Sequence, residues 1–161
     1  MPIIVHRQFI KAPIELCFDL ARNVDIHTQT TSNTKERAVG GVMQGLLVEG
    51  DTVTWEAVHF GIKQRLTVKV TLMEKPAKFV DVLLNGAFHS FVHTHQFIEK
   101  DGGTMMIDTF QYKSPLGPLG VLADILFLQK YMETFIASRA KSLKEIAEHP
   151  GHQQPGRKEE P

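Results

Sequence analysis

Apolar and polar residues alternate along two neighbouring segments, residues 88–98 and 104–113. The dipeptide Asp101-Gly102 between them is typical of a two-residue hairpin turn, because both of its positions require a positive φ that Asp tolerates and Gly adopts freely. Counting outward from this turn places Phe97 opposite Met106 and His95 opposite Asp108. We therefore predict an antiparallel hairpin with His93, His95 and Asp108 on its apolar, inward face.

Two further turns predict which strand faces are buried. A two-residue loop at Phe60-Gly61 pairs Trp55 with Leu66 on the inner face and Glu56 with Arg65 outside. A two-residue loop at Asn85-Gly86 pairs Val82 with His89 and Val80 with Phe91. This second register places His89 on the same inner face as the other histidines.

The remaining pattern completes an α+β order. It predicts a first strand over residues 2–11, two short helices from Pro13 and Asn23, and strands over 35–40, 51–59, 62–73 and 78–84. A long helix follows the loop 114–118 and runs to about Glu148. Its N-terminal third is apolar nearly all round, so we expect that end to be enclosed or to line a ligand entrance. Residues 1–148 form one domain, and residues 149–161 are a polar, solvated tail.

Composition limits the kinds of partner that the protein is expected to bind and the compartment in which we expect it. Eighteen basic residues balance eighteen acidic ones, so no net field favours nucleic acid. The apolar run 120–128 is too short to span a bilayer and contains Asp124, so we expect no membrane insertion. A single cysteine, Cys17, fits a reducing cytoplasm. We also expect no large apolar patch on the surface.

The predicted order of elements resembles that of the START-related helix-grip superfamily (SRPBCC), which has one strand, two short helices, about six antiparallel strands and a long C-terminal helix. The segments 51–61, 91–97 and 115–120 resemble its bacterial ligand-binding or cyclase/dehydrase-like branch. This resemblance implies a curved antiparallel sheet of about seven strands wrapped around the C-terminal helix, with a cavity between them.

The expected function is the binding of an apolar or aromatic small molecule, lipid-, polyketide- or aromatic-like, in that cavity. The lining should combine aromatic bulk with a few polar groups that orient the ligand. The candidate ligand-binding residues are Trp55, His59, His89, Phe91, His93, His95, Phe97, Asp108, Phe110, Tyr112, Leu122, Leu126 and Arg139.

Other interpretations stay open. His95 and Asp108 are either a structural polar pair or a general base with its orienting carboxylate in a cyclase or dehydratase. A protein-interaction domain like the helix-grip activators of chaperones is a third possibility. The His93-Thr94-His95 motif also suits a metal ion, with His59, His89 or Asp108 as a third ligand. A lone H-x-H motif is a weak signal, so we expect neither a metal nor a cofactor.

Overall fold

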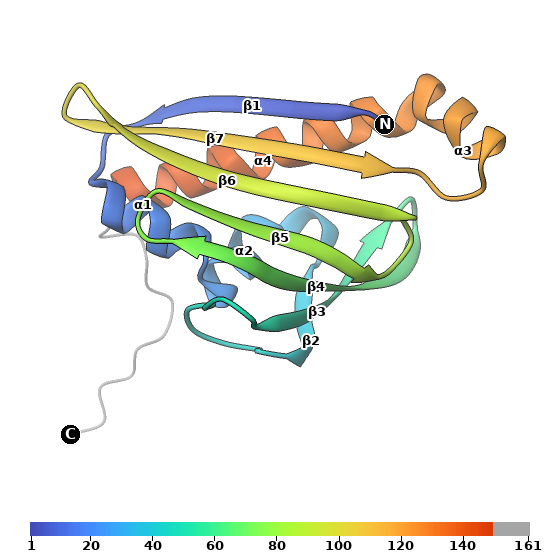
Figure 1. Ribbon diagram of the computed structural model, residues 1–161, viewed down its shortest axis with the longest axis horizontal. Helices are drawn as coiled ribbons and strands as arrows, with labels where there is room; N and C mark the ends of the chain where they lie inside the picture. The colour runs from blue at the N-terminus through green and yellow to red at the C-terminus, as the bar shows by residue number, and fades with distance from the viewer. Residues whose placement is uncertain (150–161) are drawn as a thin grey trace.

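Seven antiparallel strands form one curved sheet in the computed structural model, which describes residues 1–149 (Figure 1). The strand order across the sheet is β1-β7-β6-β5-β4-β3-β2. The strands are β1 (Ile3–Ile10), β2 (Arg37–Gly41), β3 (Thr52–His59), β4 (Ile62–Glu74), β5 (Lys78–Asn85), β6 (Ser90–Lys100) and β7 (Gly103–Lys113). The predicted architecture is confirmed, and the tail beyond residue 149 lies outside the described residues.

The helices lie between β1 and β2 and after β7. Two short helices, α1 (Ile14–Ala21) and α2 (Val24–Thr30), follow β1 as predicted, and a 3-10 turn, η1 (Ser32–Thr34), leads into β2. Asn23 caps α2 by accepting hydrogen bonds from the amides of Asp25 and Ile26. The C-terminal helix comprises α3 (Pro118–Ala123), a π-helical turn η2 (Asp124–Leu128) and α4 (Gln129–Glu148).

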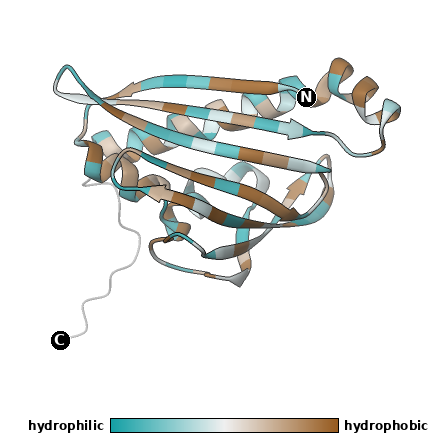
Figure 2. Cartoon of the chain, in the orientation of Figure 1, coloured by the Kyte–Doolittle hydropathy of each residue, from teal (hydrophilic) through white to brown (hydrophobic). Residues whose placement is uncertain are grey.

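The β6–β7 hairpin has the predicted register. Asp101 and Gly102 have φ angles of 50° and 78°, and His95 is the direct partner of Asp108. The β3–β4 hairpin is also confirmed, with Trp55 opposite Leu66 and Glu56 opposite Arg65. Figure 2 shows the resulting bands of polar and apolar residues along the strands.

The predicted register of β5 and β6 is wrong. Val82 pairs with Val92 and not with His89, because a longer loop of residues 86–89 joins the strands. Phe88 in this loop packs against the rings of Phe91, Phe110 and Tyr112, which holds the loop out of the strand ladder. The odd shift reverses the faces of β5, so that Asp81 points to the inner side.

The apolar stripe of α4 packs on the sheet as predicted, with Met132, Ile136 and Leu143 buried. The preceding segment of α3 and η2 is not enclosed, contrary to one of the two expectations for it, although Leu128 at the end of η2 lines the cavity. Leu122 and Leu126 are 53% and 67% exposed, and Leu116, Leu119, Val121, Ile125 and Phe127 are exposed with them. The expectation of a surface without an apolar patch is therefore also wrong. No helix within residues 1–149 has both the length and the apolarity to cross a bilayer.

Candidate functional site

A cavity of about 290 Å³ lies between the sheet and α4. It is bounded mainly by aromatic and aliphatic side chains, and polar groups enter it at a few points. Of the residues predicted to bind a ligand, those that line it are Trp55, His59, Phe91, His93, His95, Asp108, Phe110 and Arg139.

Five predicted residues do not line the cavity. Phe97 and Tyr112 are buried in the hydrophobic core on either side of it. His89 is exposed in the loop before β6, because the β5–β6 register differs from the predicted one. Leu122 and Leu126 are exposed on the surface of α3 and η2.

Two histidines and two aspartates form a buried polar cluster in the cavity wall. Nε2 of His95 lies 3.1 Å from Oδ2 of Asp81, and Nδ1 of His95 lies 2.9 Å from Oδ1 of Asp108. Nε2 of His93 lies 3.1 Å from the same Asp108 oxygen. The two imidazole rings lie against each other with their centroids 3.9 Å apart. His95 therefore sits between two carboxylates, which we call the Asp81–His95–Asp108 cluster, with His93 at its side.

The two imidazoles of this cluster differ in pKa. Burial alone lowers the pKa of His95, but the contacts with Asp108 and Asp81 outweigh it and raise the pKa above its ordinary value. Burial, followed by the charge of His95, lowers the pKa of His93. Burial opposes ionisation of both aspartates, yet the neighbouring histidines hold the pKa of Asp81 and of Asp108 below the usual range. The cluster thus favours a cationic His95 between ionised carboxylates and a neutral His93.

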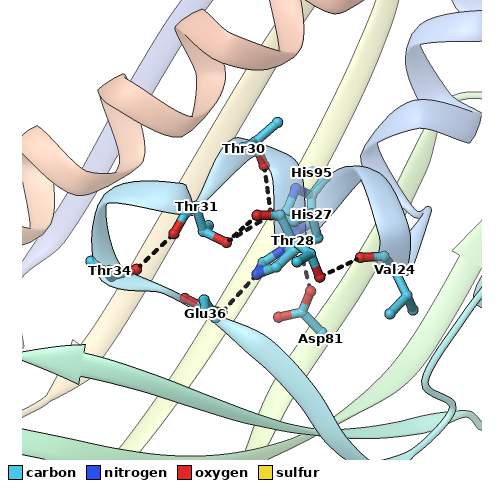
Figure 3. A network of polar contacts seen from close by, with 9 residues as sticks. All are labelled: Val24, His27, Thr28, Thr30, Thr31, Thr34, Glu36, Asp81 and His95. Carbon is cyan, nitrogen blue, oxygen red and sulfur yellow. Dashed lines mark hydrogen bonds and ion pairs between the residues drawn. The ribbon is translucent and has the colours of Figure 1, made fainter. Parts of the chain in front are cut away.

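A second polar group lies on another part of the wall. Nε2 of His27 lies 2.7 Å from Oε1 of Glu36, and the His27 ring stacks on Trp55 with a centroid separation of 4.0 Å. Figure 3 shows this contact beside the Asp81–His95 contact, with the threonine hydroxyls that hydrogen-bond the backbone around α2. Burial and then the charge of Arg139 lower the pKa of His27. His27 is therefore held neutral beside an aromatic wall.

Arg139 brings a cation to the cavity from α4. Its side chain is half-buried, and no carboxylate of residues 1–149 lies within ion-pair distance of its guanidinium. Close to the apolar segment 116–127, Nδ1 of His59 lies 2.5 Å from the hydroxyl of Tyr131, and Phe60 packs on both Tyr131 and Phe127. The cavity thus has an aromatic boundary at this end and an arginine cation beside its polar walls.

Sequence reasoning missed Asp81, His27, Glu36 and Tyr131. In the stretch Phe79-Val80-Asp81-Val82, both strand faces carry apolar residues, so alternation alone could not orient Asp81. His27 lay in a predicted short helix, and its partner Glu36, which lies between η1 and β2, could not be paired with it from local spacing. Phe88 was assigned to the predicted strand 88–98, so the longer loop of residues 86–89 was not recognised.

Comparison with known proteins identifies the fold. No protein-family model matches the chain, and no curated protein matches it by sequence. Among solved structures, TTHA0849 from Thermus thermophilus is similar with a TM-score of 0.74 at 22% identity, over 89% of this chain and 95% of that one. The major latex-like protein 151 of Panax ginseng gives 0.67 at 12% identity, over 91% and 97% of the two chains.

The Aha1 dimer from Colwellia psychrerythraea gives a TM-score of 0.64 at 18% identity, over 92% of this chain and 97% of that one. The chain therefore has a helix-grip fold, in which a curved antiparallel sheet packs on a long C-terminal helix. At these identities the helix-grip likeness establishes architecture, and the function has to be argued from the cavity itself.

Proposed function

We propose that this helix-grip protein binds a small, mainly apolar or aromatic molecule in the cavity between its sheet and α4. The observation that supports this most is the composition of the cavity wall. Phe91, Phe110 and Trp55 supply apolar surface, and the polar groups of the wall include the cluster, the His27–Glu36 pair and Arg139. Ligand sites in proteins combine apolar walls with a few convergent polar groups in this way.

The volume limits the size of the ligand. A cavity of about 150 Å³ accommodates benzene, so one of about 290 Å³ suits a molecule of about two fused rings or a short branched chain. A long acyl chain does not fit without expansion. The guanidinium of Arg139, which has no carboxylate partner among residues 1–149, favours a ligand with one anionic or strongly polar end.

The catalytic alternative, with His95 as general base, has less support. Both ring nitrogens of His95 face carboxylates, and its raised pKa favours the protonated form, which cannot accept a proton. His93, whose pKa is lowered, is the imidazole of this cluster that stays neutral. We therefore propose ligand binding and not His95-based catalysis.

A matched pair of substitutions on α4 tests the proposal. Ala140 lines the cavity, whereas Ala147, two turns further along the same helix, is equally buried but lies in the other part of the core. Ala140→Leu, which adds volume inside the cavity, should abolish calorimetric binding of 2-naphthol, and Ala147→Leu, which adds the same side chain outside it, should retain binding. Native mass spectrometry of protein purified from its own cells should show a retained small molecule. The absence of both signals in the wild type would contradict the proposal.

A further inference from the structure

The strongest unexplained feature of the cavity is a set of metal-ligand donors on two adjacent strands. Each of the residues Asp81, His93 and His95 offers one donor atom, and these three atoms lie within 4.8 Å of one another. Asp81 on β5 is the cross-strand partner of His93 on β6, and His95 is two residues further along the same face. The β-sheet register therefore places the three side chains in one layer. We propose that they bind a divalent first-row transition metal ion of the zinc type.

The formal charge of the cluster supports a cation. Asp81 and Asp108 bring two negative charges into the protein interior, and no lysine or arginine of residues 1–149 pairs with either carboxylate. Buried carboxylates require compensation by a cation or a metal ion. The protonated His95 offsets one of these charges in the metal-free protein, and a divalent ion that displaces its proton would offset both.

The contacts of His95 are also unusual for a histidine with a purely structural role. The side chain is 1% exposed. Its Nδ1 atom makes no well-directed hydrogen bond, although Oδ1 of Asp108 lies 2.9 Å away. Buried polar atoms nearly always have such a partner. A metal ion bound to one ring nitrogen of His95 would change the orientation that the imidazole adopts. Asp108 is close enough to both imidazoles to orient them from the side away from the ion, as carboxylates do for metal-bound histidines.

The donor set and spacing agree with this class of metal. Two imidazole nitrogens and one carboxylate oxygen form a common catalytic or binding set for zinc and neighbouring metals, with bonds of about 2.0–2.2 Å. Such bonds bring donor atoms to within about 3.5 Å of each other, and Asp81 and His95 are already 3.1 Å apart. All three residues line the cavity, so the open coordination positions would face it and could accept a ligand oxygen.

Metal titration of chelator-treated protein tests this inference. Co²⁺ followed by visible absorption, and Zn²⁺ followed by calorimetry, should each bind at one ion per chain. Asp81→Asn keeps the size of the side chain at a partly exposed position and should weaken binding by at least about tenfold. His93→Gln should act in the same direction.

The matched control is Glu36→Gln. Glu36 also pairs with a histidine of the cavity wall, His27, but lies outside the Asp81, His93 and His95 donor set, so this variant should bind Co²⁺ like the wild type. No binding by the wild type would overturn the inference, as would binding that survives both Asp81→Asn and His93→Gln. The probe is the metal alone, so this result is independent of whether 2-naphthol distinguishes Ala140→Leu from Ala147→Leu.

Discussion

The carboxylate of Asp81 lies 3.1 Å from Nε2 of His95, although the strand partner of Asp81 is His93. This diagonal contact completes the row from Asp81 through His95 to Asp108. It places a fully buried imidazole between two carboxylates at the wall of the cavity. The charge state of this row is the property of the site that can be measured most directly.

His95 should be the most basic of the cavity histidines in the metal-free protein. Contacts with Asp108 and Asp81 raise its pKa, whereas burial lowers the pKa of His93, His27 and His59. For these four rings, imidazole ¹⁵N spectra recorded across a pH titration should therefore show one that deprotonates above pH 6.5 and three that deprotonate below it. His95→Gln should remove the first signal. A His95 ring that is already neutral at about pH 6 would contradict this assignment.

Asp108→Asn should destabilise the fold strongly. Removing one partner from a buried charged cluster costs about 3–5 kcal/mol, and Asp108 contacts both His93 and His95. Urea unfolding at about pH 6 measures the loss. Lys144→Gln is the control, because Lys144 pairs with Glu148 from a half-exposed position on α4, and it should change the free energy of unfolding by about 0–1 kcal/mol. Equal effects of the two variants would contradict the proposed energetic role of the cluster.

The same variant should show a defined pH dependence. The pKa of Asp108 is lowered in the folded state, so its contribution to stability is present above the unfolded value near 3.8 and is lost as the pH falls toward the folded value. The raised pKa of His95 has the opposite sign, and its contribution declines as the pH rises through the folded value. The stability difference between wild type and Asp108→Asn should be largest between about pH 4 and 6.5. A difference that grows steadily below about pH 4 would show that another group controls the acid limb.

Arg139 should select for an anionic end on the ligand. Replacing it with Gln removes a charged hydrogen-bond donor, which costs about 1.5–3 kcal/mol of binding free energy for a carboxylate partner. Calorimetry with 2-naphthoate should detect this loss, whereas 2-naphthol, of the same ring size, should bind Arg139→Gln and wild type alike. Equal losses for both compounds would assign Arg139 to the shape of the cavity and not to charge recognition.

The sequence predicted most elements of the fold. It also predicted the inward position of His93, His95 and Asp108, but not that of Asp81. The Asp101-Gly102 and Phe60-Gly61 turns both have the positive φ angles of two-residue hairpin loops, so counting from them placed His93, His95, Asp108 and Trp55 correctly. Asn85-Gly86 offered the same local signal, but the packing of Phe88 on three distant rings determined the loop there. That long-range contact decides which face Asp81 occupies, and no local pattern reports it.

The C-terminal helix shows a second limit of pattern reading. An apolar helix surface predicts burial only if another element covers it, and the sequence does not say how far the sheet extends. The sheet covers α4, whereas Leu122 and Leu126 in the preceding segment remain exposed. The sequence identified these two residues correctly as apolar, but the expectation that they would be enclosed was wrong.

Fluorescence of Trp55 tests most directly the central claim that the internal cavity binds small aromatic molecules. Trp55 is the only tryptophan, is 5% exposed, lines the cavity and stacks on His27. Nitrobenzene, a small aromatic quencher, should reduce its emission along a saturable curve with one site per chain, and Ala140→Leu should remove the saturable component while Ala147→Leu preserves it. Quenching that stays linear in nitrobenzene concentration, or that is identical in the two variants, would contradict a cavity that binds small aromatic molecules.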